Sequence, residues 1–313
     1  MPFCLHVLLL LSTTAFPSSN LDLARVREEQ RQRVEVFAKA AESVVLIYPN
    51  AAREGGGSGV LIDADGYGVT NFHVVAEFVQ QGGYGALADG KLYPLTVLGI
   101  DPGGDVAMFK LEGRDEFPFA PFGPKSLPRL GQTVAAMGNP FVLSENYDPT
   151  ISMGVISGLH RYQEGQENLL EYADCIQVST SINPGNSGGP LFDLDGHVIG
   201  INGRASFEER GRVNVGLGYA ITTQQIKRFI PALRAGLLTQ HGTLGATVQL
   251  AGDDLIVDAI QQLSPAERVG IEIGDVVVAI QGQPVRTPNE YNNVVAPMPA
   301  DWPVTVTLKR GNT

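Results

Sequence analysis

Residues 181–202, SINPGNSGGPLFDLDGHVIGIN, surround one serine with glycines and then continue as two short apolar runs joined by an Asp-Gly turn. Glycine lets a backbone adopt left-handed conformations and come close to a ligand, so the glycines around Ser187 indicate either a plain loop or a turn whose backbone lies close to a reacting substrate. The runs PLF and HVIGIN predict two paired strands. This stretch therefore indicates a β fold with a serine on a tight turn.

The same residues also satisfy the G-x-S-x-G pattern of the α/β-hydrolase nucleophile elbow. That elbow needs a helix after the serine, with the acid and the histidine later in the chain. Here a strand, a turn and another strand follow, and the histidines after Ser187 are His197, near the hairpin turn, and His241. The elbow interpretation therefore fails.

The strand-and-turn pattern covers most of the 313-residue chain. From Ser43 to about Tyr219, short apolar runs such as VVLIY, SGVLID and VAMFKL alternate with Asp-Gly turns, and two packed β-barrels or a sandwich would account for this. The segment TTQQIKRFIPALRAG predicts one helix, capped by Thr222 or Thr223 and kinked or ended by Pro231. We place a domain boundary just after it, near residue 238.

The remaining segment, from about His241, predicts a second, smaller domain that is β-rich with two helices. Ser264 opens a short helix, VVVAI follows as a buried strand, and Thr287-Pro-Asn-Glu is a capping box at the start of the second helix. Val304, Val306 and Leu308 predict a final strand by their alternation.

The N-terminus predicts an export signal followed by a helix. Residues 1–19 contain an apolar run that is short for a membrane span, which needs about 20 residues, but suits the core of a signal peptide. An uncleaved anchor and an ordinary buried segment are the alternatives. Residues 20–42 predict a charged helix with a thin apolar stripe, which would pack on the next domain or serve oligomerisation.

The composition limits the possible ligands. The formal charge is −11 and no Lys/Arg cluster stands out, so we expect no nucleic-acid partner. Cys4 lies in the predicted signal, which leaves Cys175 as a small buried strand residue without a disulfide partner. The sequence has no HExxH and no clustered ligands, so we expect no metal and no cofactor.

Two residues upstream of Ser187 complete a histidine, aspartate, serine order. His73 lies in VTNFHVVAE, at the end of a β run and the start of a short helical turn, and Asp105 lies in GIDPGGDVAMFKL, directly before an apolar strand. A nucleophilic serine needs a base within hydrogen-bond reach, and the base needs a carboxylate that fixes its tautomer. The spacing puts base and acid in the first barrel and the serine in the second. Taken singly, His73 could be structural and Asp105 a turn residue.

Three separated motifs, VTNFHVV, GGDVAMFKL and SINPGNSGGPLFDLDGHVIGIN, resemble the HtrA (Deg) family of trypsin-like serine endopeptidases. The stretches GGGSGVLIDADGYGVTN, AAMGNPF and GLGYAI extend the resemblance, and SPAERVGIEIGDVVVAIQGQPV resembles the PDZ domain that follows the protease. The resemblance implies a mainly β protein: a chymotrypsin/trypsin-like double β-barrel over residues 43–238, then a small PDZ domain over residues 239–313 that stops before the family's last strand.

The resemblance also implies site residues. Ser187 would be the nucleophile, His73 the general base and Asp105 its orienting carboxylate. The turn Gly185-Asn186-Ser187 would form the oxyanion hole, with the N–H groups of Gly185 and Ser187 as donors. The further expected site residues are Ile182, in a small apolar specificity pocket or simply in the core; Leu217, Gly218 and Tyr219, paired with the substrate as an added strand; and Thr243, Leu244, Gly245 and Ala246, the carboxylate-binding loop of the PDZ domain.

By this resemblance the protein is an exported serine endopeptidase of the periplasm or cell envelope that degrades unfolded or damaged envelope proteins. Its partners would be extended polypeptides, C-terminal peptides at the PDZ domain, and further copies in a homotrimer or larger oligomer. A regulatory protease with one native substrate and a non-proteolytic chaperone or peptide-binding scaffold are the alternatives. Ser179-Thr180-Ser181 replaces the family's aspartate-alanine-alanine, and Arg204 stands where smaller residues are common, which leaves the cleavage preference open.

Overall fold

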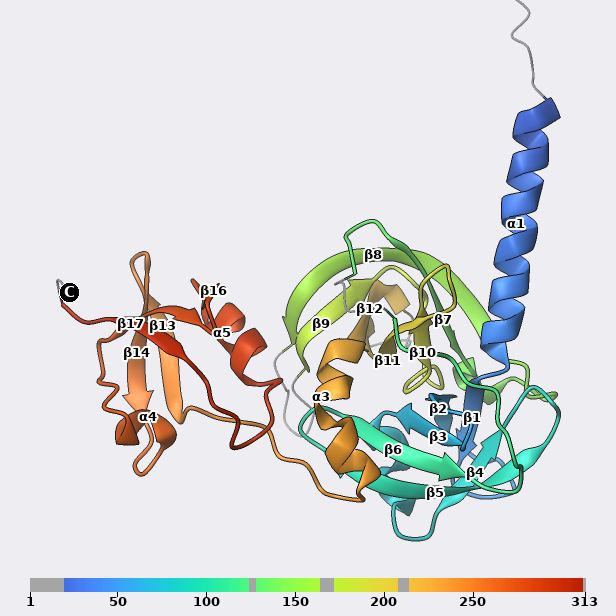
Figure 1. Cartoon of the computed structure of the whole chain (residues 1–313), viewed down its shortest axis with the longest axis horizontal. Helices are drawn as coiled ribbons and strands as arrows, with labels where there is room; N and C mark the ends of the chain where they lie inside the picture. The colour runs from blue at the N-terminus through green and yellow to red at the C-terminus, as the bar shows by residue number, and fades with distance from the viewer. Residues whose placement is uncertain (1–19, 124–127, 164–171, 208–213, 312–313) are drawn as a thin grey trace, which may run out of the picture. The chain divides into compact units, whose positions relative to one another are not determined.

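The first part of the fold is a closed antiparallel barrel with strand order β1-β2-β3-β6-β5-β4 (Figure 1). The structure, a computed structural model, describes residues 20–123, 128–163, 172–207 and 214–311. The strands are β1 (Val44–Tyr48), β2 (Gly57–Leu61), β3 (Tyr67–Thr70), β4 (Gly83–Ala86), β5 (Leu92–Asp101) and β6 (Val106–Leu111). Two short helical turns, α2 (Phe72–Val75) and η1 (Ala76–Phe78), follow β3. The predicted turns at Gly66 and Gly90 both have positive φ, as their Asp-Gly sequences require.

A second closed antiparallel barrel follows, with strand order β10-β11-β12-β9-β8-β7. Its strands are β7 (Thr133–Gly138), β8 (Thr150–Gln163), β9 (Tyr172–Val178), β10 (Pro190–Phe192), β11 (Val198–Phe207) and β12 (Asn214–Thr222), with the short helix η2 (Pro140–Val142) after β7. Cys175 is a buried residue of β9, as predicted, and burial raises the pKa of its thiol far above the usual range. The double β-barrel is therefore confirmed.

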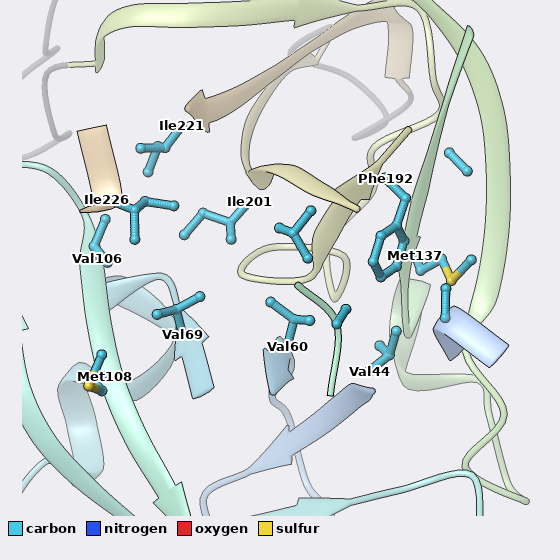
Figure 2. Close-up of a cluster of buried hydrophobic side chains, with 14 of the residues drawn as sticks. Val44, Val60, Val69, Val106, Met108, Met137, Phe192, Ile201, Ile221 and Ile226 are labelled. Atoms are coloured by element: carbon cyan, nitrogen blue, oxygen red, sulfur yellow. The ribbon is translucent and has the colours of Figure 1, made fainter. Parts of the chain in front are cut away.

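One hydrophobic core is shared by the two barrels (Figure 2). Val60, Val69 and Met108 enter it from the first barrel, and Phe192 and Ile201 enter it from the second. A fully buried side chain of this size contributes roughly 1.5–3 kcal/mol relative to an exposed one. By packing Val69 and Met108 in one cluster with Phe192, this shared core fixes the position of β3 and β6 relative to β10 and the residues next to it.

The helix α3 (Thr223–Arg234) follows β12 directly. Thr222 is its N-cap and accepts a hydrogen bond from the Gln225 amide at 3.2 Å. Of the two effects predicted for Pro231, a kink or an end, the end is wrong, because the helix continues to Arg234. It stops one turn later, where Gly236 has a φ of +77° and its amide bonds to the Leu233 carbonyl.

The C-terminal segment forms a small sheet with two helices. Its elements are β13 (Ala246–Ala251), β14 (Asp254–Ile260), α4 (Pro265–Arg268), β15 (Val276–Ile280), β16 (Gln283–Pro284), α5 (Pro288–Val295) and β17 (Val306–Lys309). Ser264 and Thr287 cap α4 and α5, as predicted. The capping box differs in one detail, because the Glu290 carboxylate accepts the amide of Arg286 rather than that of Thr287. The final strand begins at Val306 and does not include Val304.

The helix α1 (Asn20–Ala41) precedes the first barrel. Residues 25–35 of this helix carry exposed ion pairs at helical spacing, such as Arg25–Glu29 and Arg31–Glu28. Phe37 and Ala40, near its end, are buried in the core that the barrels share. Among the described helices, none has the length and apolar character needed to cross a membrane. The predicted signal, residues 1–19, lies outside the described residues.

We predict that Phe192→Ala lowers the free energy of unfolding by about 3–5 kcal/mol, because it opens a cavity in the shared core. Chemical denaturation measures the change. Leu194→Ala is the matched control: Leu194 is 41% exposed, so its loss should change stability by less than about 0.5 kcal/mol. Equal effects of the two substitutions would contradict the assignment of the core.

Candidate active site

His73 and Asp105 form a hydrogen-bonded pair at one end of the first barrel. His73 lies on α2, directly after β3, and Asp105 lies directly before β6, which pairs with β3. The Nδ1 atom of His73 lies 2.8 Å from Asp105 Oδ2, and the His73 amide donates to Asp105 Oδ1 at 2.9 Å. The pairing of the two strands therefore brings together residues that are 32 positions apart in the chain.

Asp105 is held in an unusual backbone conformation. Its side chain is buried, and its φ of +53° lies in the left-handed region. Such a conformation costs a non-glycine residue about 1 kcal/mol or more. The side-chain amide of Asn71 donates to the Asp105 carbonyl at 2.9 Å and supports this conformation. The carboxylate is thereby aimed at both N–H groups of His73.

The pair also changes the protonation of the imidazole. Burial lowers the pKa of His73, but the hydrogen bond to Asp105 and its negative charge act in the opposite direction and together raise this pKa above its ordinary value. A carboxylate at Nδ1 favours the tautomer with the proton on Nδ1, so the lone pair of Nε2 is available to accept a proton. The pair has the arrangement of a general base with its orienting acid.

The turn that carries Ser187 packs against the first barrel. The Ser187 carbonyl accepts the Ser58 amide at 2.9 Å, and Ser58 belongs to β2, which pairs with β3. A Cβ atom on Gly188 would lie 2.1 Å from Thr70 Oγ1, and one on Gly185 would lie 2.1 Å from the Asn139 carbonyl oxygen. Both glycines also have positive φ. Gly188 is thus required by the close approach of the turn to the first barrel, and Gly185 by its packing on the chain after β7 of the second barrel.

The hydroxyl of Ser187 donates to the Gly203 carbonyl at 3.2 Å. Among the described residues no hydrogen bond joins Ser187 to His73, so the serine is not engaged by the base in this state. Within the described residues the amides of Gly185 and Ser187 have no hydrogen-bond acceptor, whereas the Asn186 amide donates to the Asn183 carbonyl at 2.9 Å. The first two N–H groups are free to bind an oxyanion, and that of Asn186 is occupied.

The residues expected to contact the substrate differ in what they can do. Ile182 is buried and packs against Gly218, where a Cβ atom would lie 2.7 Å from Ile182 Cδ1. Gly218 pairs with Val178 of β9 on one side and with Ala205 of β11 on the other. An inner strand of a closed barrel has no free edge there, so Gly218 cannot receive an added strand. Leu217, one residue earlier, is exposed.

In the expected carboxylate loop, residues 243–246, one amide is already used. The Gly245 amide donates to Thr243 Oγ1 at 3.0 Å, and the hydroxyl of Tyr291, on α5, donates to the Ala246 carbonyl at 2.9 Å. A cavity of about 740 Å³ lies beside the loop, with Thr243, Leu244 and Val295 among its lining residues. The loop therefore adjoins a cavity that could receive a peptide side chain.

Two residues at the site were missed in the sequence. Gly203 holds the Ser187 hydroxyl, and Tyr172 donates a hydrogen bond from its hydroxyl to Asp105 Oδ2. A glycine within a strand, such as Gly203 in β11, and an aromatic residue at the start of one, such as Tyr172 in β9, are common features, and neither carries a local signal for such a contact. The first contact forms within the second barrel, and the second forms only when that barrel packs against the first.

Comparison with known proteins matches both parts of the chain. A trypsin-like peptidase domain model matches residues 57–201, and a PDZ domain model matches residues 242–313. A probable periplasmic serine endoprotease DegP-like from Chlamydia pneumoniae is 35% identical over 267 residues, which is 81% of this chain and 52% of that protein. The counterpart in Rickettsia conorii is 33% identical over 81% of this chain and 51% of its own length. The chain thus spans about half the length of these curated relatives.

Solved structures agree over nearly the whole fold. The HtrA-type protease AlgW with a tripeptide superimposes with a TM-score of 0.73 at 30% identity, covering 90% of this chain and 93% of AlgW. The serine endoprotease from Yersinia pestis gives a TM-score of 0.65 at 28% identity, covering 90% and 94%. With the two barrels, the serine turn between them and the small C-terminal sheet already in place, the conclusion is that this chain belongs to the HtrA (Deg) family of trypsin-like proteases with a PDZ domain.

Proposed function

We propose that this chain is an exported serine endopeptidase that cleaves unfolded or extended polypeptides in the cell envelope. The observation that carries the proposal is the 2.8 Å hydrogen bond between His73 and Asp105, with the Ser187 turn packed on the neighbouring strands of the same barrel. Curated relatives that are named periplasmic serine endoproteases support both the activity and the compartment. Residues 1–19 would supply the export signal.

The chemistry follows from the geometry of these groups. Nε2 of His73 takes the proton of the Ser187 hydroxyl as Oγ forms a bond to the scissile carbonyl carbon, and Asp105 stabilises the resulting imidazolium. The negative charge on the carbonyl oxygen is met by the free N–H groups of Gly185 and Ser187, and one such donor is worth roughly 3 kcal/mol in the transition state. His73 then gives its proton to the leaving amine, and water hydrolyses the acyl-enzyme by the same steps.

The position of the Ser187 hydroxyl favours a resting enzyme. To reach His73 the hydroxyl must leave the Gly203 carbonyl. Catalytic hydrogen bonds often form only when a substrate is bound. The same observation supports a second candidate function, a peptide-binding scaffold whose triad never aligns. A protease is the better account, because a scaffold has no use for a buried Asp105 aimed at His73.

The substrate and partner classes are part of the proposal. Ile182 against Gly218 would form the wall of a small apolar specificity pocket, which favours cleavage after small or medium apolar side chains. Residues 243–246 and the adjoining cavity would take the C-terminus of a peptide. The AlgW structures with a tripeptide and a decapeptide show that a related chain binds short peptides. As in the family resemblance, we infer a homotrimer or larger homo-oligomer that degrades damaged envelope proteins, with cleavage of one native regulatory substrate as the alternative.

We predict that Ser187→Ala leaves the fold intact and lowers casein cleavage by on the order of 10⁶-fold, since the nucleophile is lost. Ser157→Ala, which removes an exposed hydroxyl from β8 of the same barrel, should cleave at the wild-type rate. A fluorophosphonate probe should label the wild type and the Ser157 variant but not the Ser187 variant. Failure to label the wild type, with or without a C-terminal peptide, would favour the scaffold.

The rate constant for fluorophosphonate labelling should rise with pH as His73 loses its proton. Because Asp105 raises the pKa of His73, the midpoint should lie above the value of about 6.5 for an unperturbed histidine. Asp105→Asn removes the charge, so burial then dominates and the midpoint should move to lower pH. The rate constant should also fall by on the order of 10⁴-fold. An unmoved midpoint would contradict the pairing of Asp105 with His73.

A further inference from the structure

Tyr172 is a buried residue of the second barrel whose hydroxyl reaches into the first. It is the first residue of β9, and its side chain is almost fully enclosed. The hydroxyl donates a hydrogen bond to Oδ2 of Asp105. Asp105 lies directly before β6 of the first barrel. Tyr172 therefore connects the second barrel with the carboxylate that orients His73.

The Asp105 carboxylate is shared between donors from both barrels. Its Oδ1 atom accepts the amide of His73, and its Oδ2 atom accepts both Nδ1–H of His73 and the hydroxyl of Tyr172. Each hydrogen bond that the Asp105 carboxylate accepts is stabilised by its negative charge, so the interaction with each single donor becomes weaker as donors are added. The hydroxyl thus competes with the imidazole for Oδ2 and limits how strongly Asp105 binds the proton of His73.

The ring of Tyr172 supports the serine as well. A Cβ atom on Gly203 would lie 2.5 Å from Tyr172 Cε1 and 3.1 Å from Cζ, so the ring packs directly on the Gly203 backbone. The Gly203 carbonyl is the acceptor of the Ser187 hydroxyl. One side chain thus contacts the acid of the proposed triad and also the peptide that holds its nucleophile.

We propose that Tyr172 is a positioning residue that couples closure of the second barrel to the alignment of Asp105, His73 and Ser187. Its hydroxyl fixes the carboxylate and sets the basicity of His73, and its ring fixes the Gly203 peptide. This inference rests on the proposed function, because positioning matters only if the three residues react. It differs from that proposal in assigning a role to a residue that does not touch the reacting atoms.

The test compares Tyr172→Phe with the wild type and with Tyr93→Phe. Tyr93 is a matched control, because it is also buried and its hydroxyl also donates to a carboxylate, that of Asp89, at 2.6 Å. Two quantities are measured: kcat on labelled casein per active site titrated with fluorophosphonate, and the pH dependence of the labelling rate constant.

Tyr172→Phe should lower kcat by on the order of 10- to 100-fold, the loss typical of a hydrogen bond to a charged group. Oδ2 then accepts a hydrogen bond from His73 alone, so the pKa of His73 should rise. The acidic limb, which is the low-pH part of the labelling profile where the rate constant rises with pH, should move to higher pH. Tyr93→Phe should match the wild type in both readouts. A Tyr172→Phe enzyme whose kcat and acidic limb superimpose on those of the wild type would overturn the proposal.

A second variant tests the same role in case Tyr172→Phe folds poorly. Gly203→Ala leaves the hydroxyl present but pushes the ring away, so the limb should again move to higher pH, and its midpoint does not depend on how much protein is folded. If neither variant moves the limb, Tyr172 has no positioning role. A wild type that fluorophosphonate does not label would overturn the proposed function and this inference together. A labelled wild type with an unmoved limb in both variants overturns only the inference.

Discussion

The proposed chemistry depends on the hydrophobic interface between the two barrels. His73 and Asp105 belong to the first barrel and Ser187 to the second, so no local structure can bring all three together. The shared core, with Val69 and Met108 on one side and Phe192 and Ile201 on the other, fixes the strand ends that carry them. Polar contacts such as the Ser58 amide to the Ser187 carbonyl then set the separation of the turn from β2 and β3. Packing of the apolar side chains stabilises the interface, and these hydrogen bonds fix the position of the Ser187 turn relative to β2 and β3.

The glycines of the serine turn follow from its close packing, Gly188 against the first barrel and Gly185 against the second. At Gly188 and Gly185 a Cβ atom would overlap an oxygen atom of β3 or of the chain after β7. Both glycines have positive φ, and among the described residues the amides of Gly185 and Ser187 have no hydrogen-bond acceptor. The close packing of the turn and an available pair of N–H groups are therefore found in the same short segment, residues 185–188.

Much of the fold could be predicted from the sequence, because it follows from local patterns. The alternation of apolar runs with Asp-Gly turns indicated the barrels, and Thr222, Ser264 and Thr287 act as the expected caps. The His73–Asp105 pairing was also within reach, since each residue adjoins one of two neighbouring strands. The local rule that a proline ends a helix does not hold at Pro231, because α3 continues past this residue for three more positions.

The contacts that could not be predicted arise only when the barrels close. Gly218 looked available for a substrate strand, but closure pairs it on both edges. The Ser187 hydroxyl rests on Gly203, and Tyr172 reaches Asp105, across distances in sequence that no periodicity encodes.

Peptide mapping of the fluorophosphonate adduct by mass spectrometry tests the central claim most directly. One phosphonyl group should be found on Ser187, and its formation should require His73, so that His73→Ala abolishes it while the protein stays folded. A phosphonyl group on another serine, or an adduct on Ser187 that forms at the same rate without His73, would contradict the account.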